Sequence, residues 1–218
     1  MAKAKRALVE HRPWLLAGIA AALAFYFLWN NPIGGLWLIA IKGAAVGSLV
    51  IYTWRWSVGT DGTILAIVLA LAAAADMAIE LWFEVGGALF ALSHAVAIVL
   101  YLRNRRERLV LSQKLLAVAL FAVTPAVSYL LSGDLLILVY GTALGAMAAA
   151  AWTSRFPRYR VGIGAVLFVV SDWLIFSRMG AFDLGVLPDV LVWPLYFAGQ
   201  LMIATGVVQT LRGEKTAR

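Results

Sequence analysis

Residues 63 to 82 read TILAIVLALAAAADMAIELW, and this stretch decides the fold class of the chain. Apart from Asp76 and Glu80 it is almost wholly apolar, and it has the length of about 20 residues that a helix needs to cross a bilayer. The rest of the chain has the same character, with 63% hydrophobic residues and a mean hydropathy of +0.90. Soluble domains contain roughly half apolar residues. The sequence therefore predicts an all-α integral membrane protein.

Apolar runs separated by charged or turn-forming breaks predict a bundle of about eight transmembrane helices. Breaks such as NNPIGG after Trp29 and SRFPRYR from Ser154 carry the turn and charge signals of helix ends. We expect residues 1 to 218 to form a single transmembrane domain. The predicted spans cover about residues 14 to 29, 33 to 52, 63 to 82, 85 to 102, 114 to 131, 135 to 152, 161 to 178 and 191 to 211.

Basic residues predict the orientation of the bundle, because cytoplasmic loops are enriched in Lys and Arg. With eight spans, 16 of the 18 basic residues fall on one side, leaving Arg178 at an outer end and Lys42 within a span. An odd number of spans before any basic loop would destroy this segregation. Both termini are therefore expected to be cytoplasmic, in a multi-pass protein of the cell membrane that we expect to be bacterial.

Charge and composition also limit the partners and the chemistry. The net charge of +7 lies in short clusters between apolar runs, which is typical of loops beside anionic lipid rather than of nucleic-acid binding. The chain has no cysteine, which excludes thiol catalysis, and only two histidines, of which His11 lies outside the membrane. Asp76, His94 and Asp172 are candidate metal ligands, but we expect neither a metal nor a cofactor.

Few ionisable side chains lie within the predicted spans, and apart from the outer residue Glu80 they share one depth with two tyrosines and a glutamine. A charged side chain at the centre of a membrane helix costs about 2.5 to 3.5 kcal/mol, so such groups usually face a cavity. At about 1.5 Å per residue, all of them fall roughly five to nine residues from the outer ends of their spans. The layer predicted in the outer half of the bundle comprises Lys42, Asp76, His94, Tyr140, Asp172, Tyr196 and Gln200.

Simpler interpretations of these residues stay open. Lys42 and Asp76 would make a structural ion pair, and His94 would be a hydrogen-bonded packing residue. Glu80, one turn beyond Asp76, is interpreted as an outer residue that reaches water or pairs with Arg178. The positions of Asp76 and Asp172, each in the third helix of one half, also suggest a parallel repeat of about residues 1 to 110 and 111 to 218.

Three segments resemble a known family, and the similarity spans most of the chain from Lys42 onward. The segments are DMAIELWFEVGGALFALSH from Asp76, GAVLFVVSDWLIF from Gly164, and LYFAGQLMIATG from Leu195. Together they are similar to the YhhN-like lysoplasmalogenases. The chain departs from that pattern at Ala75, where the family usually has Gly, and at Ala97, where it usually has Tyr. The ordered set that carries the resemblance is Lys42, Asp76, Gly86, Phe90, His94, Tyr140, Gly164, Ser171, Asp172, Tyr196 and Gln200.

The resemblance implies a hydrolase that cleaves the vinyl ether bond of a lysophospholipid, the lysoplasmalogen. The products would be a fatty aldehyde and glycerophosphoethanolamine or glycerophosphocholine. This chemistry needs a proton donor and a group that activates water, and two buried carboxyl groups can supply both. We assign Asp76 and Asp172 as the acid/base pair, without deciding which is the acid.

The same hypothesis gives the other residues supporting roles. Lys42 would bind the phosphate or keep one Asp ionised, and the residues that would orient water and the glycerol oxygens are His94, Tyr140, Ser171, Tyr196 and Gln200. The competing interpretation is a proton-coupled transporter or lipid-binding membrane protein that uses the same polar layer without bond cleavage. Pro125 and Pro194 are the main interruptions in the spans, so the broken helices of many transporters are not evident.

Overall fold

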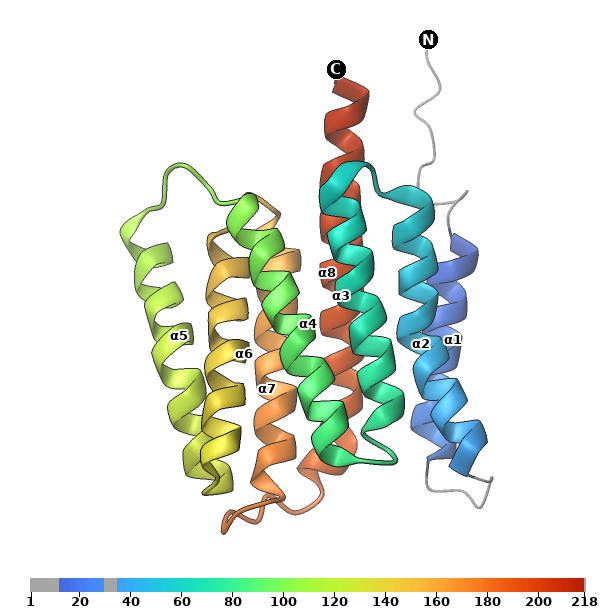
Figure 1. The fold of residues 1–218 in the computed structure, drawn as a ribbon, viewed down its shortest axis with the longest axis vertical. Helices are drawn as coiled ribbons and strands as arrows, with labels where there is room; N and C mark the ends of the chain where they lie inside the picture. The colour runs from blue at the N-terminus through green and yellow to red at the C-terminus, as the bar shows by residue number, and fades with distance from the viewer. Residues whose placement is uncertain (1–11, 30–34, 218) are drawn as a thin grey trace.

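The computed structural model describes residues 12–29 and 35–217, which form a bundle of helices (Figure 1). No strand occurs in these residues. A π-helical turn, η1 at Arg158–Gly162, leads directly into α7. The helices are α1 Arg12–Leu28, α2 Gly35–Trp56, α3 Gly59–Ala78, α4 Phe83–Arg103, α5 Leu111–Ser132, α6 Leu135–Thr153, α7 Ile163–Ser177 and α8 Leu187–Ala217.

Seven helical segments in the described part of the chain, from α2 to α8, are long and apolar enough to span a membrane. The shorter apolar helix α1 packs against α2. Each predicted span thus corresponds to one helix, and the predicted all-α membrane bundle is confirmed. The predicted parallel repeat stays a prediction.

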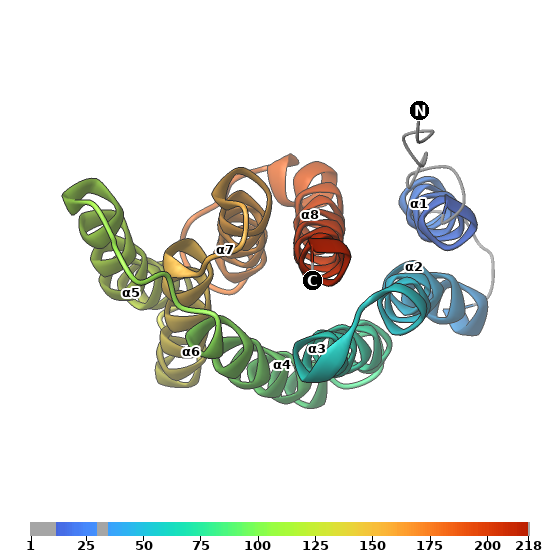
Figure 2. The same cartoon turned by 90° about the horizontal axis from the view of Figure 1, so that it is seen from above.

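The helices form two layers, in which the first and last helices, α1 and α8, are in contact. Seen from above, α1, α2, α3, α4, α6 and α5 follow an arc, and α7 and α8 lie on its concave side (Figure 2). Within this arrangement α8 contacts α1, α2, α3 and α7, while α7 also contacts α5 and α6. The two inner helices therefore meet residues from both halves of the arc.

The basic loops gather at one end of the bundle, as the charge pattern predicts. The connections α2–α3, α4–α5 and α6–α7 lie at the end where α1 begins and α8 finishes (Figure 1). Arg178 follows α7 at the opposite end. We call this opposite end the outer end, because the positive-inside rule predicts that it faces away from the cytoplasm.

Helix α3 begins and ends earlier than hydropathy predicts. It covers Gly59–Ala78 instead of residues 63 to 82, with Asp61 in its first turn, where a carboxylate stabilises the helix dipole. Asp76 is therefore close to the end of its helix and shallower than predicted, although it is only 2% exposed. Gly86 allows the tight return into α4, because a Cβ there would lie 2.7 Å from the backbone of Ile79.

Two glycines bring α7 and α8 into close contact. A Cβ on Gly164 would lie 2.8 Å from the Gly199 carbonyl oxygen, and one on Gly199 would lie 2.6 Å from that of Gly164. Such distances are shorter than Cβ atoms tolerate, so only glycine permits this approach. The contact fixes α7, which carries Asp172, against α8, which carries Tyr196.

Candidate active site

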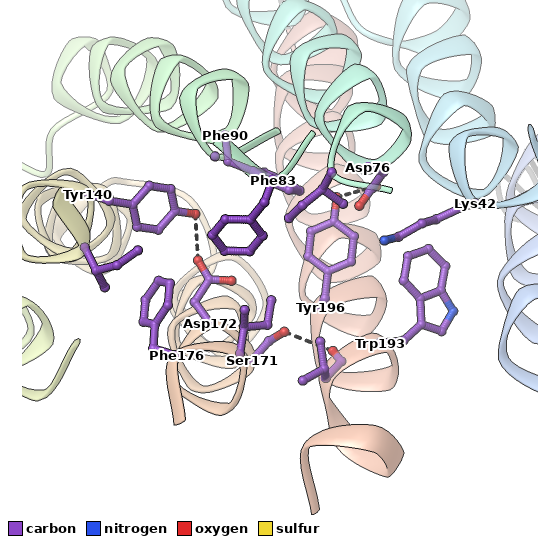
Figure 3. A pocket seen from close by; sticks show the side chains of 15 residues that line it. Lys42, Asp76, Phe83, Phe90, Tyr140, Ser171, Asp172, Phe176, Trp193 and Tyr196 are labelled. Atoms are coloured by element: carbon purple, nitrogen blue, oxygen red, sulfur yellow. Dashed lines mark hydrogen bonds between the residues drawn. The ribbon is translucent and has the colours of Figure 1, made fainter. Parts of the chain in front are cut away.

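A cavity of about 80 Å³ lies toward the outer end of the bundle, between α2, α3, α4, α6, α7 and α8 (Figure 3). Most of its walls are apolar, including Phe83, Phe90, Ile137 and Phe176. Its polar lining consists of six residues that the sequence predicts as site residues. They are Lys42, Asp76, Tyr140, Ser171, Asp172 and Tyr196.

Asp76 is held in this cavity by a hydrogen bond from α8. The Tyr196 hydroxyl donates to Asp76 Oδ2 at 2.6 Å, and Gln200 Nε2 donates to the same hydroxyl at 3.5 Å. Asp76, Tyr196 and Gln200 are 2%, 5% and 2% exposed. A buried carboxyl group requires such partners, because an unsatisfied one is costly.

Asp172 is held in the same way, but by other helices. The Tyr140 hydroxyl of α6 donates to Asp172 Oδ2 at 2.7 Å, and His94 Nε2 of α4 lies 3.1 Å from that hydroxyl. Because the Tyr140 proton is directed at Asp172, His94 Nε2 acts as the donor to the tyrosine oxygen. Each carboxyl group therefore accepts a hydrogen bond from a tyrosine hydroxyl, and that hydroxyl in turn accepts one from a side-chain nitrogen.

Aromatic rings fill the space between these two hydrogen-bonded groups. Phe168 packs edge-on against His94 with ring centroids 5.0 Å apart, and against Tyr196 at 5.1 Å. Phe90 completes the group by packing against Phe168 at 5.9 Å and Tyr196 at 5.7 Å. These rings restrict Tyr196 and His94, while Tyr140 packs against His94 and Phe176 with ring centroids 5.5 and 5.7 Å apart.

Lys42 does not form the predicted ion pair with Asp76. Its Nζ atom instead lies 2.5 Å from Glu80 Oε1, and the two side chains are 12% and 39% exposed. Glu80 is an exposed outer residue, as one of its two interpretations predicts, and the other one, a pair with Arg178, is not formed because Arg178 pairs with Asp189 at 2.6 Å. Lysine has a long flexible stem, so its charge reaches outward past Asp76 to the more exposed carboxylate.

The two remaining predicted residues, His94 and Gln200, do not line the cavity. They contact the hydroxyl groups of Tyr140 and Tyr196 from behind. Ser171 does line the cavity, but its hydroxyl donates to the Val192 carbonyl at 2.9 Å and so connects α7 to α8. These three side chains position other groups in this structure.

Sequence reasoning missed Trp193, which closes the cavity on the side of α1. Its indole Nε1 donates to the Ala22 carbonyl at 2.9 Å, and its ring contacts Tyr196 with centroids 5.7 Å apart. Trp193, Tyr196 and Gln200 follow the i, i+3, i+7 spacing of one helical face, which would have revealed this residue. Phe176, by contrast, lies in an apolar run and carries no distinguishing signal.

The site is a buried pair of hydrogen-bonded carboxyl groups in an apolar cavity. Among the described residues, no three His, Asp or Glu side chains come together in a group that could hold a metal ion. Carboxyl groups in a cavity that excludes bulk water can differ in protonation and exchange protons with a bound molecule. The arrangement thus provides two separate proton-transfer groups.

Fold and site together define a multi-pass helical membrane protein with a buried two-carboxyl cavity at one end. Comparison with known protein families matches residues 37–207 to the YhhN family. The chain belongs to this family. Neither a curated protein nor a solved structure shows a significant match. The matched region contains all of the residues that line the cavity.

Proposed function

We propose that the protein is a membrane hydrolase that cleaves the vinyl ether bond of lysoplasmalogen, releasing a fatty aldehyde and a glycerophospho-base. The observation that carries this proposal is the pair Asp76 and Asp172, buried in one cavity and each fixed by its own tyrosine. Membership of the YhhN family supports it. We place the basic end in the cytoplasm of a bacterial cell.

Vinyl ether hydrolysis begins with a proton transfer to carbon. One Asp, in its acid form, protonates the β-carbon of the vinyl ether, and the electron pair of the double bond forms the new C–H bond. The resulting oxocarbenium ion is attacked at the α-carbon by water, which loses a proton to the other, ionised Asp. The product of these steps is a hemiacetal.

Breakdown of the hemiacetal returns both carboxyl groups to their starting states. The first Asp, now ionised, removes the hydroxyl proton while the C–O bond to glycerol breaks. The second Asp, now protonated, gives its proton to the departing glycerol oxygen. Two carboxyl groups are therefore sufficient for the whole reaction, with water as the only co-reactant.

The cavity suits the reacting group of such a substrate. A cavity of about 80 Å³ is far smaller than a whole lipid, so it would take the vinyl ether segment together with a few waters. The alkenyl chain would continue along the apolar residues of the wall. Small size and apolar walls also limit the water near the oxocarbenium ion.

Aldehyde release by the purified protein tests the proposal. We expect wild-type protein in bilayer discs to release aldehyde from lysoplasmalogen, and Asp76→Asn and Asp172→Asn each to lose most of this activity. Glu84→Gln, an exposed carboxylate in the first turn of α4, is the matched control and should retain activity. Near-normal turnover by both folded Asp variants would rule out the mechanism.

The transporter or lipid-binding alternative gives a different result in the same preparation. Such a protein would bind or move the intact amphiphile without producing aldehyde. Mass spectrometry of co-purifying lipids, combined with the aldehyde assay, separates the two functions.

A further inference from the structure

A second hollow of about 110 Å³ adjoins the cavity at the outer end of the bundle. It lies between α1, α2, the segment after α3, and the start of α8. Lys42, Val192 and Trp193 line both hollows, so they form a common wall. We call the second hollow the vestibule and define it by its four charged residues, Lys42, Glu80, Arg178 and Asp189.

The charges of the vestibule are balanced. Two cations and two carboxylates line it, arranged as the pairs Lys42–Glu80 and Arg178–Asp189. The Arg178 and Asp189 side chains are 43% and 53% exposed, whereas the Lys42 side chain is 12% exposed. The vestibule therefore has an accessible ion pair, Arg178–Asp189, at its outer side and a nearly buried cation, Lys42, beside the cavity.

Aromatic rings hold the buried cation at the common wall. Lys42 Nζ lies 5.3 Å from the Phe25 ring centroid and 5.8 Å from that of Trp193. Both distances are in the range of cation–π attraction. Tyr26 and Trp29 of α1 also line the vestibule, and such residues are enriched at the level of lipid head groups.

We propose that the vestibule binds the zwitterionic phosphodiester head group of the lysophospholipid, an inference that rests on the proposed function. Lys42 and Arg178 bind the phosphate, and the carboxylates of Glu80 and Asp189 bind the ammonium group. A zwitterion adds one charge of each sign between two existing ion pairs, so every charge keeps an opposite neighbour. An anionic head group would leave the two carboxylates facing added negative charge.

The same arrangement places the glycerol backbone at the common wall. The head group stays at the outer surface, near Tyr26 and Trp29, while the vinyl ether enters the cavity past Lys42. Lys42 then contacts the phosphate rather than the reacting bond. This geometry accounts for the position of the Lys42 ammonium group at the common wall, where it pairs with Glu80.

Binding of uncleavable amphiphiles tests the vestibule separately from catalysis. The probe is a 1-O-alkyl-glycerophosphoethanolamine, and the comparison ligands are the 1-O-alkylglycerol without a head group and the anionic 1-O-alkyl-glycerol phosphate. We expect wild-type protein in bilayer discs to bind the zwitterionic probe about tenfold more tightly than either comparison ligand. Because none of these ligands has a vinyl ether, the result does not depend on turnover.

Variants of the exposed ion pair connect this preference to the vestibule. Arg178→Gln should abolish most of the preference, and Lys42→Gln should do the same if it folds. Arg103→Gln is the matched control, because Arg103 forms a similar exposed pair with Asp61 at the opposite end.

Three outcomes would overturn the proposal. The first is equal affinity for ligands with and without a head group, and the second is tighter binding of the anionic ligand. The third is that Arg178→Gln shows the same preference for the zwitterionic probe as Arg103→Gln. If wild-type protein prefers the zwitterionic probe but releases no aldehyde from lysoplasmalogen, the result would count against the hydrolase mechanism alone.

Discussion

The two carboxyl groups of the cavity have the same immediate partner and different surroundings. Asp76 and Asp172 each accept a hydrogen bond from a tyrosine hydroxyl, at 2.6 and 2.7 Å. Lys42 lies beside Asp76 on one side of the cavity, whereas Asp172 lies beside Tyr140 on the other (Figure 3). Asp76 thus lies beside the vestibule, and Asp172 lies at the far side of the cavity from Lys42 (Figure 3).

The different surroundings of Asp76 and Asp172 allow one cavity to distinguish the two carbons of a vinyl ether. With the head group in the vestibule, the ether oxygen and α-carbon come first along the cavity, and the β-carbon lies deeper. Asp76 then faces the carbon that water attacks, and Asp172 faces the carbon that is protonated. The comparison therefore predicts that Asp76 is the base and Asp172 the acid.

The largest expected effect is the loss of the acid. Asp172→Asn should lower kcat for aldehyde release by about 10² to 10⁴, the range that general acid–base groups contribute. The decrease in kcat for Asp76→Asn should lie in the lower part of that range, because an oxocarbenium ion reacts readily even with unactivated water. Single-turnover aldehyde release measures both variants, and a smaller loss in Asp172→Asn than in Asp76→Asn would contradict the assignment.

Rescue by azide sharpens the comparison. Azide needs no base, so it should accelerate substrate loss in Asp76→Asn by about tenfold, where activation of water has become limiting. It should not help Asp172→Asn, which lacks the proton for the earlier step. Substrate consumption at increasing azide concentration is the measurement, with wild-type protein as the control. Acceleration of Asp172→Asn alone would reverse the two roles.

The sequence predicts the helices and most of the polar cavity because both depend on strong, local signals. A carboxyl group in an apolar run stands out by its insertion cost, and positive charges mark every second connection. Six of the eight predicted site residues consequently line one cavity. Depth along a helix was sufficient to find five of them, and the family resemblance added Ser171.

Pairing between helices was not predictable in the same way. The sequence placed Lys42 and Asp76 at similar depth, but the choice of Glu80 depends on where α3 ends and on how far the lysine stem reaches. The aromatic ring of Phe176 was not predicted, because an apolar residue in an apolar span has no distinctive pattern. The vestibule likewise combines four charged residues that are separated along the chain.

Removing the tyrosine hydroxyls has a smaller expected effect than removing the acids. Hydrogen bonds to charged groups contribute about 1.5 to 3 kcal/mol, so each variant should lose roughly 10- to 100-fold in kcat. Tyr196→Phe leaves Asp76 with Lys42 still nearby, whereas Tyr140→Phe removes the only side-chain hydrogen bond that Asp172 accepts among the described residues. We therefore expect the larger loss in Tyr140→Phe.

The control for these variants is Tyr129→Phe, a 40% exposed tyrosine on α5. It should retain normal turnover. Equal losses in Tyr140→Phe and Tyr196→Phe would show that the charge near Asp76 does not compensate for its missing hydrogen bond.

The smallest expected effects separate the residues behind the tyrosines. His94 Nε2 lies 3.1 Å from the Tyr140 hydroxyl, whereas Gln200 Nε2 lies 3.5 Å from that of Tyr196, at the limit of a hydrogen bond. A neutral hydrogen bond contributes about 1 kcal/mol, so His94→Leu should lower kcat by about fivefold, and Gln200→Leu by about twofold or less. Steady-state kinetics at saturating lysoplasmalogen measures both.

Rescue by a second substitution distinguishes positioning from packing at His94. The side-chain nitrogen of His94→Gln can reach the Tyr140 oxygen, so this variant should recover most of the activity that His94→Leu loses. A purely structural role would instead make both variants lose thermal stability and activity together. Recovery of turnover without a matching change in melting temperature would assign His94 to the orientation of Tyr140, and through it of Asp172.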